Sequence, residues 1–516
     1  PHLTRAKAIA ESLGVTHMPV QFPEVFRREP SGFDCIVGNP PWDKVRHEPQ
    51  QFWVTVSPGL NALADDAREA AITDLRRSHP TEAERERAEI LWRSAQQELF
   101  KTAFTLRGGT HVELAQLVLE RALRVTRTGG SLGLVLPRQL TVLAGWSVLR
   151  EHLTQNYDLQ VVQGRNQGEW IFEGIDERYA VVLLSGHASE DPHTLLGVAT
   201  SAEDVKAWSR QACVRLSAAE VANLSPSHVL PWFGSPSDRV VFDAMCNAPK
   251  LAGGKGWIHG WHDARWDFRG TGPDRGLTSR TDQVGAWRVM MTAHVDAFAF
   301  DYGEPFKQYV NDHLALAAKG RGVVIDEHGN VSLGTDHPVI AVRHPSRSDD
   351  SRTLIATALP AQGLLHNKGY VHAVATADGT SPDQELALLG YINTITADWW
   401  ARRFTDRHIT APVLNQLALP DWNDAQVEEA AAITGTLLAR SGATTLAGDI
   451  TVVDAHEETS EALLVRLNQL ALDGFLLTTP HLEIMLKDFK TKGVPLTLRE
   501  ALHEVVAASA AVVGQQ

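Results

Sequence analysis

The clearest chemical signal lies in Asn39-Pro40-Pro41-Trp42, which directly follow the apolar run Phe33–Val37. Such a run predicts a buried strand, and open α/β sheets bind ligands at the carboxyl ends of their strands. The two prolines fix φ and restrict the residues before them, so the loop is rigid and its carbonyls can face a ligand. The Asn39 side-chain oxygen and the Pro40 carbonyl can then accept both hydrogens of a planar exocyclic amine. Its lone pair would thereby be oriented toward an electrophilic methyl group.

Trp42 adds a π face on which a nucleic-acid base can stack, an interaction that contributes about 1–3 kcal/mol per base in related sites. A base inside a duplex must be flipped out to reach such a pocket. The four residues together therefore predict methylation of a base amino group. Two alternatives remain open, because an NPP triplet also occurs in ordinary loops and because Trp is a frequent core residue.

The surrounding sequence alternates short β-type runs with helical ones from Phe33 to about Gly186, which predicts a doubly wound α/β sheet. Val112–Val125 has a broad apolar face at helical spacing and predicts a helix that packs on this sheet and is ended by Gly129-Gly130. Between Asp43 and Leu106 lies a charge-rich insertion. It contains one long amphipathic helix over residues 81–104, which we expect to cover or border the active cleft.

The hydrophobic pattern of the sequence changes after the predicted sheet. The periodic pattern weakens over 191–230 and predicts a connector, whereas 231–422 has short β-like runs broken by turns and predicts a mixed α+β domain. Residues 423–516 have helical periodicity, with a helix start at Thr479-Pro480. The sequence thus predicts a catalytic domain over 1–190, a connector, a second domain and a helical C-terminal region.

Composition narrows the class of protein. The chain has 516 residues, 43% hydrophobic and 21% charged, which excludes a mostly disordered chain or a fibre. Lys plus Arg number 48 and Asp plus Glu 62, so the net charge is −14, and a polyanion would have to bind a locally basic surface. The longest uncharged apolar stretch, Val505–Gly514, is half of what a bilayer-spanning helix needs, so we expect no membrane association.

Cysteine and histidine usage predicts a reduced, metal-free protein. The three cysteines are far apart and form no CxxC pair, which favours the cytoplasm. The 22 histidines show no ligand spacing that is typical of a metal site. We therefore expect no metal in catalysis.

Beyond these four residues, three longer segments resemble one enzyme family. They are PVQFPEVF…GFDCIVGNPPWDKV, GGTHVELAQLVLERALRVTRTGGSLGLVLPRQL and NQGEWIFEGIDERYAVVLL. They look like successive catalytic blocks of amino-directed DNA methyltransferases with an NPP[YFW] motif, in particular the type IIG restriction-modification enzymes and the adenine methyltransferases of phage-defence systems such as BREX and DISARM. DHPVIAVRHPSRSDDSRTLIATALP and LLGYINTITADWWARRFTDRHITAPVLNQLALPDW resemble the target-recognition region of the same enzymes.

The resemblance implies a Rossmann-like methyltransferase sheet, of which this chain carries the C-terminal half, followed by a target-recognition domain over 231–422. It implies that Asn39, Pro40 and Trp42 hold and stack a flipped adenine, with Pro41 shaping the loop. Phe172 would contact the base from the other side, with Trp170 as its rival and burial in the core as the alternative.

Polar positions of the recognition pattern imply contacts with double-stranded DNA. Arginine could read guanine edges there, and Ser or Thr could hold phosphates. A basic helix could instead follow the backbone or present a solvated face. The implied DNA-contacting residues are Arg343, Ser351, Arg352, Thr353, Arg402 and Arg403.

One departure from the family concerns the cofactor. The resemblance implies S-adenosylmethionine, yet the Gly-rich turn that binds it in the family normally precedes the NPP motif by many tens of residues, and only 38 residues precede Asn39 here. We therefore expect an upstream segment or another subunit of the defence system to complete the fold, and we assign no cofactor-binding residue.

Two functions follow. The first is a site-specific DNA adenine N6-methyltransferase of a restriction-modification or phage-defence system. The alternative is a catalytically inactive DNA-recognition or scaffold subunit, which the missing Gly-rich turn favours and the intact NPPW motif opposes. A protein or RNA methyltransferase is disfavoured by the long recognition-like region. The target sequence, an accompanying nuclease and the choice of N6-adenine over N4-cytosine do not follow from the residues themselves.

Overall fold

The structure of the protein is a computed structural model. It describes residues 4–5, 17–108, 112–177, 179–207, 213–224, 227–253, 255–258, 260–263, 278–279, 287–301, 303–307, 309–310, 312, 323–325, 328, 331–333, 339–344, 346–358, 364–366, 371–377, 379–405, 408–443 and 451–513. The chain divides into two compact units, Pro1–Leu230 and Pro231–Gln516. Each unit is described by itself.

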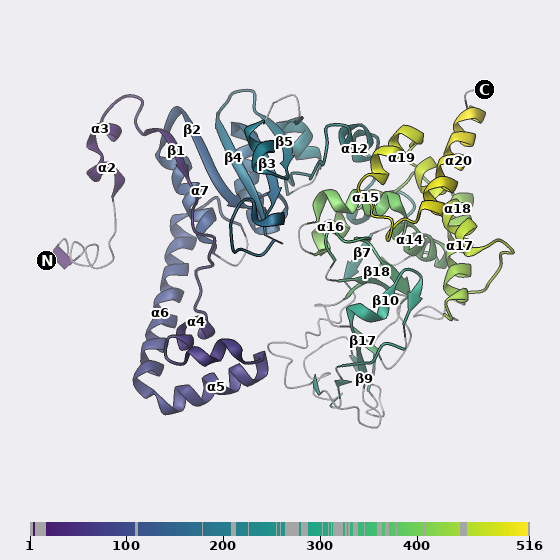
Figure 1. Ribbon diagram of the computed structural model, residues 1–516, viewed down its shortest axis with the longest axis horizontal. Coiled ribbons are helices and arrows are strands. Elements are labelled where there is room, and N and C mark those ends of the chain that lie inside the picture. The colour runs from purple at the N-terminus through teal and green to yellow at the C-terminus, as the bar shows by residue number, and fades with distance from the viewer. Residues whose placement is uncertain are drawn as a thin grey trace. The chain divides into compact units, whose positions relative to one another are not determined.

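The first unit is built on a six-stranded mixed sheet (Figure 1). Its order is β1-β2-β4-β3-β5-β6, with β1 parallel to β2, β3 parallel to β5, and β4 and β6 antiparallel to their neighbours. The strands are β1 (Phe33–Gly38), β2 (Thr126–Pro137), β3 (Tyr157–Arg165), β4 (Ala180–Ala188), β5 (His193–Ala199) and β6 (Val214–Ser217). The predicted alternation of strands and helices is confirmed, while the finer Rossmann-like assignment remains a proposal.

Two crossover helices connect strands of this sheet. α7 (Leu114–Val125) connects β1 to β2, and α9 (Ser147–Asn156) connects β2 to β3. α7 packs on β2, and α9 packs on β3. That the sheet is doubly wound stays a prediction.

Strand β1 differs from the expectation of a buried strand. It lies at the edge of the sheet, Val37 is 79% exposed, and Cys35 is exposed. An edge strand has a sheet neighbour on one side only, so its apolar run is not fully covered.

The pairing of β1 with β2 contains an irregularity. Phe33 lies opposite Thr126 but Cys35 lies opposite Ser131, and from there the register is continuous to Gly38 opposite Leu134. Gly129 has a φ of +73° and belongs to this bulge. The prediction that Gly129-Gly130 ends the preceding helix is therefore wrong, because the helix ends at Val125 and both glycines lie in β2.

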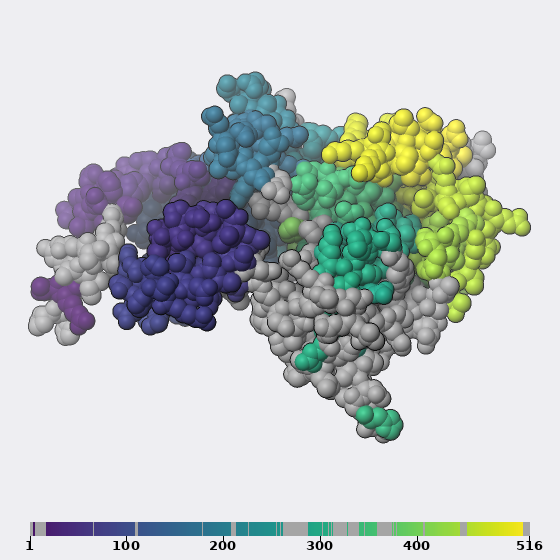
Figure 2. Space-filling model, turned by 60° about the horizontal axis from the view of Figure 1, so that its bottom comes forward, coloured from purple at the N-terminus to yellow at the C-terminus, as the bar shows by residue number. Residues whose placement is uncertain are grey.

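The residues between β1 and α7 form a helical insertion. It comprises α4 (Pro49–Val54), a short 3-10 helix (Pro58–Ala62), α5 (Asp65–Ser78) and α6 (Pro80–Ala103), so the long predicted helix is present. The insertion has a small core of its own, formed by Trp53, Leu60, Ile72 and Ala83. In Figure 2 it is a continuous mass of dark purple to blue atoms.

The remaining elements of the first unit are short. Residues 191–230, expected to be a connector, contribute β5 and β6 to the sheet. The other helices are α2 (Met18–Gln21), α3 (Pro23–Phe26), α8 (Gln139–Val142), α10 (Ala202–Lys206) and α11 (Ala218–Leu224).

The second unit combines small sheets with helices, as the mixed α+β prediction requires. One four-stranded antiparallel sheet has the order β16-β15-β18-β7, and another has the order β17-β9-β12-β8. The strands are β7 (Trp261–Asp263), β8 (Thr278–Ser279), β9 (Trp287–Met290), β10 (Val295–Asp296), β11 (Ala299–Phe300), β12 (Tyr309–Val310), β13 (Val323–Ile325), β14 (Val331–Leu333), β15 (Val339–Arg343), β16 (Ala356–Ala358), β17 (Leu364–His366) and β18 (Val371–Thr376).

The core of the second unit surrounds one helix, α15, all of whose residues are buried. Trp399 and Trp400 on this helix are among its largest buried side chains, and Trp400 stacks on Phe242 with ring centroids 4.9 Å apart. The helices are α12 (Asp238–Cys246), α14 (Pro382–Ile392), α15 (Ile395–Phe404), α16 (Ala411–Asn415), α17 (Asp424–Arg440), α18 (Ser460–Asp473), α19 (Thr479–Leu486) and α20 (Leu496–Val513). The predicted helical C-terminal region is confirmed.

Candidate active site

The NPPW loop leaves the end of β1 beside the carboxyl-terminal part of β2. Gly38 is the last residue of β1 and pairs with Leu134. Asn39 is exposed, Pro40 is buried, and Pro41 is exposed. The buried proline ring anchors the loop, which leaves the Asn39 side chain accessible at the carboxyl end of the strand.

Trp42 turns back over the neighbouring strand. Its indole Nε1 donates a hydrogen bond to the Val135 carbonyl at 3.4 Å, and the side chain is half-buried. Its ring meets the edge of Phe172, with centroids 5.8 Å apart and an interplanar angle of 75°. The structure therefore brings together two aromatic residues that the sequence analysis assigned to one base site.

Phe172 is held by a residue that the sequence analysis missed. Asn166 is fully buried, and its amide donates to the carbonyls of Phe172 at 2.9 Å and Ile175 at 2.8 Å. Its side-chain oxygen accepts the backbone N–H groups of Ile171 at 3.1 Å and Phe172 at 2.9 Å. Asn166 thus closes the loop that presents Phe172. A possible signal was an Asn directly after a strand and ahead of Gly168 and Gly174, which both adopt positive φ.

Trp170, the rival of Phe172, is placed differently. Its indole Nε1 donates to the Arg165 carbonyl at 2.7 Å. A Cβ built on Gly164 would lie 3.1 Å from Trp170 Cζ2, so the indole packs against the bare backbone at the end of β3. Trp170 therefore supports the loop, and Phe172 is the ring that reaches Trp42.

The chain that leaves the motif is fixed to the start of α7. Leu114 N–H donates to the Asp43 carbonyl, and Val45 N–H donates to the Val112 carbonyl, both at 2.9 Å. The buried Glu113 carboxylate accepts the Trp146 indole N–H at 2.9 Å and lies 4.0 Å from Lys44 Nζ. Anchors on both sides hold the loop in place before any ligand binds.

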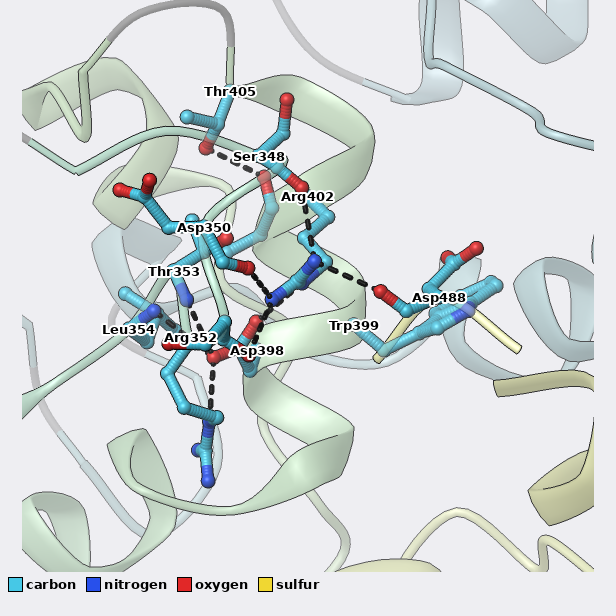
Figure 3. A network of polar contacts seen from close by, with 12 residues as sticks. Ser348, Asp350, Arg352, Thr353, Leu354, Asp398, Trp399, Arg402, Thr405 and Asp488 are labelled. Atoms are coloured by element: carbon cyan, nitrogen blue, oxygen red, sulfur yellow. Dashed lines mark hydrogen bonds and ion pairs between the residues drawn. The ribbon is translucent and has the colours of Figure 1, made fainter. Parts of the chain in front are cut away.

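The residues predicted to contact DNA in the recognition region are placed mainly inside the second unit. Figure 3 shows Arg352 and Arg402 converging on Asp398, which is fully buried. Arg352 Nε donates to one carboxylate oxygen at 2.8 Å and Arg402 Nε to the other at 2.7 Å. Burial alone would raise the pKa of Asp398, but the two guanidinium groups outweigh it and the pKa is lowered.

This network shapes the loop between β15 and β16. Thr353 is buried, and its N–H and that of Leu354 donate to Asp398. Arg402 also donates to the carbonyls of Ser348, Asp350 and Ser351 within that loop, at 2.9, 2.9 and 3.2 Å. Thr353 and the two arginines are thus engaged in internal contacts, which favour a structural role over direct DNA contact.

Arg403 is occupied in the same way. Its guanidinium donates to Asp238 at 2.8 Å, pairs with Asp488, and lies 4.2 Å from the centroid of the Trp399 ring. Only 1% of the residue is exposed. It links α12 and the segment after α19 to the central helix.

Apart from Arg352, which is half-buried and bonded to Asp398, the predicted DNA-contacting residues that remain accessible in part are Arg343 and Ser351. Both are half-buried. Arg343 lies at the end of β15, and its buried Nε has no hydrogen-bond partner among the described residues. Its guanidinium is therefore less committed to the fold than those of Arg352, Arg402 and Arg403.

A cavity of about 200 Å³ in the first unit is lined by residues such as Ser131, Asp158, His187 and Arg215. It lies beside the middle of β2 and the amino end of β3, and the four NPPW residues do not line it. Within the described ranges no cluster of His, Cys, Asp or Glu is arranged to hold a metal ion, and no helix is long and apolar enough to cross a bilayer.

Comparisons with known proteins find restriction-modification enzymes among solved structures. No family model matches the chain, and no curated protein matches it. The chain resembles the type IIG restriction endonuclease BpuSI at 11% identity, covering 75% of this chain and 50% of BpuSI, with a TM-score of 0.29. It also resembles MmeI, a type IIL enzyme solved with DNA, at 10% identity. This match covers 77% of this chain and 52% of MmeI, with a TM-score of 0.37. The match with LlaBIII, an ATP-dependent type ISP enzyme bound to DNA, has 8% identity. It covers 79% of this chain and 30% of LlaBIII, with a TM-score of 0.38. The chain spans about half the length of BpuSI and MmeI and less of LlaBIII.

Proposed function

We propose that this chain carries the base-binding half of a site-specific DNA adenine N6-methyltransferase of a restriction-modification or phage-defence system. The observation that supports this most is the meeting of Trp42 and Phe172 beside Asn39 at the carboxyl end of β1. The two aromatic residues are far apart in sequence, and each was assigned to the base by a separate motif.

In this proposal the chain's own residues bind and orient the base. Asn39 Oδ1 and the Pro40 carbonyl accept the two amine hydrogens, which fixes the amine plane and directs its lone pair to one side. Trp42 supplies the stacking face. Holding the amine in line with its methyl donor contributes to the rate through proximity and orientation.

The methyl donor, S-adenosylmethionine, is assigned to residues outside this half of the fold. The position of β1 supports this assignment, because in the part of the chain that the structure describes it is an edge strand paired with β2, and such an edge can accept a further strand. An upstream segment or another subunit would provide it. We derive no catalytic step through the cofactor from the residues of this chain.

The second unit is proposed to read the target sequence. Arg343 and Ser351 remain candidates for contact with DNA, and the Asp398 network would fix the loop that carries Ser351. Arg352, Thr353, Arg402 and Arg403 would then influence site choice through the shape of this loop.

The test is transfer of a labelled methyl group from S-adenosylmethionine to unmethylated double-stranded DNA, with and without the segment encoded upstream, followed by nucleoside analysis. We expect N6-methyladenine when the fold is complete. Asn39→Ala should abolish transfer and leave DNA affinity within about twofold, whereas Asn61→Ala, an exposed asparagine in the insertion, should change neither.

The outcomes separate the competing functions. Full activity in Asn39→Ala would overturn the catalytic assignment. DNA binding without transfer in any form of the protein would instead support the inactive recognition or scaffold subunit. N4-methylcytosine as the product would retain the mechanism and change the target base.

A further inference from the structure

The outer face of α6 carries an apolar stripe that the fold does not use. Leu91 is 72% exposed, Trp92 is 45% exposed and Leu99 is 63% exposed. Ala88 and Ala95, on the same side of the helix, are exposed as well. At 100° per residue these five positions fall on one side of the helix. Large exposed apolar side chains in a continuous row typically mark an interaction surface.

The opposite side of the same helix already has its partners. Ala83 belongs to the core of the insertion, and Glu86 is 3% exposed and pairs with His47 and Arg76. Gln97 and Phe100 face the chain that leaves the NPPW loop and the start of α7. The stripe is therefore not needed to hold α6 in the first unit.

The spacing of the stripe fits a second helix of the same kind. Ala88, Trp92, Ala95 and Leu99 follow one another at intervals of four, three and four residues, the repeat of a coiled-coil seam. When two copies of α6 run antiparallel about a two-fold axis near residue 93, Trp92 lies opposite Ala95 of the other copy, and Ala88 lies opposite Leu99. Each large side chain then faces a small one.

The charges beside the stripe distinguish the antiparallel from the parallel arrangement. Arg87 and Glu98 are exposed on the same flank of the stripe. In the antiparallel pair Arg87 of each copy lies within about one turn of Glu98 of the other. Glu98 would there exchange the exposed pair that it makes with Lys101 of its own helix for one across the seam. In a parallel pair the same flanks of the two helices lie on opposite sides of the seam, so Arg87 of one copy would not meet Glu98 of the other.

We propose that α6 is a dimerisation helix through which two copies of this chain associate in antiparallel orientation. The proposal does not depend on the proposed enzymatic function. The apolar row spans about 16 Å of helix, so the interface belongs to the small class that dissociates on dilution. A second copy is favoured over nucleic acid because acidic Glu84 and Glu98 border the stripe together with basic Arg87, and such mixed charge complements a second copy better than a polyanion.

Sedimentation velocity of the full chain, from about 1 to about 100 µM, tests the proposal. We expect a monomer–dimer equilibrium in the wild type and a monomer at every concentration in Trp92→Glu. Val148→Glu, on an exposed apolar residue of α9, is the matched control and should dimerise like the wild type. A wild type that stays monomeric would overturn the proposal, and a dimer that survives Trp92→Glu would assign the interface elsewhere.

A charge exchange tests the orientation without changing the apolar row. Arg87→Glu and Glu98→Arg should each weaken the homodimer by about tenfold at low salt, because each places two like-charged pairs across the axis. An equimolar mixture of the two variants should recover the dimer, because every cross-copy pair is then of opposite charge. A mixture that associates no better than either variant alone would exclude the antiparallel pair.

Discussion

Trp42 and Phe172 meet edge to face, with ring centroids 5.8 Å apart. A base stacked between two rings needs them parallel and about 7 Å apart, twice the ordinary stacking distance. The observed pair therefore fills the space in which a base would be sandwiched. A base can enter by displacing Phe172 or by stacking on the remaining face of one ring.

This arrangement predicts a measurable role for Phe172. Phe172→Ala should lower the rate of methyl transfer by roughly 5–100-fold, the equivalent of one lost stacking contact, with little change in the affinity for DNA. Trp170→Phe, which keeps an aromatic ring beside Gly164, should have a smaller effect. Equal losses in both variants would mean that the loop as a whole, and not the Phe172 ring, is what matters.

The stability of the loop that carries Phe172 should depend on the side-chain amide of Asn166. Asn166→Asp replaces two hydrogen-bond donors with a carboxylate oxygen facing the carbonyls of Phe172 and Ile175. Because this leaves a buried charge among acceptors, we expect a loss of about 3 kcal/mol in unfolding free energy and faster proteolysis within residues 166–177. Gln167→Glu, at the exposed next position, is the control. Unchanged proteolysis in Asn166→Asp would show that other contacts hold the loop.

The arginines of the second unit should differ in whether their substitution affects stability or DNA recognition. Arg402→Lys loses the planar fork that binds Asp398 and the loop carbonyls, so the unfolding free energy should fall by about 2–4 kcal/mol while the DNA affinity of the folded fraction is kept. Arg343→Ala should do the reverse, with weakened or relaxed site recognition and nearly unchanged stability. Urea denaturation and DNA titration on both variants check this, and identical behaviour would reject the distinction.

The helical insertion between β1 and α7 should lose stability as the pH falls. Bidentate hydrogen bonds from Arg76 lower the pKa of Glu86 from 4.5 to about 2. A carboxyl group with a lowered pKa stabilises the fold above its ordinary pKa of 4.5, and this stabilisation is lost as the pH falls toward 2. Glu86→Gln should therefore cost about 3 kcal/mol at pH 7 and much less near pH 2.

Hydrogen exchange of peptides within residues 47–103 measures this local stability. Glu190→Gln, at an exposed position between β4 and β5, is the control. A Glu86→Gln variant whose exchange matches the wild type at pH 7 would contradict the assigned role of the ion pair.

Local patterns predicted β1, α6 and α7 because each is encoded by neighbouring residues, whereas β5 and β6 lie where a connector was expected. The apolar run Phe33–Val37 predicted β1, and the helical spacing of Val112–Val125 predicted α7 to within two residues. The exposure of Val37 was not predictable in this way, because it depends on the position of β1 in the sheet. That position is set by pairing with β2, which is distant in sequence.

The recognition residues show where local sequence is misleading. Arg402 and Arg403 form a basic pair in the sequence, which is typical of a DNA-facing helix. The partners of Arg403, Asp238 and Asp488, lie more than 80 residues away. Asp398, at i−4 from Arg402, was the one local signal of an internal ion pair.

The irregular pairing at the start of β1 and β2 allows the number of residues in β2 to change without changing the register of the regular pairs that follow. Thr128 and Gly129 are exposed there, whereas Leu134 stays opposite Gly38 through the regular pairing that begins at Cys35. Extra residues between Thr128 and Gly129 would lengthen the bulge without moving the NPPW loop. This position, in the irregular first part of β2, can therefore accept an inserted tag or fluorescent reporter, while the geometry that presents Asn39 is preserved.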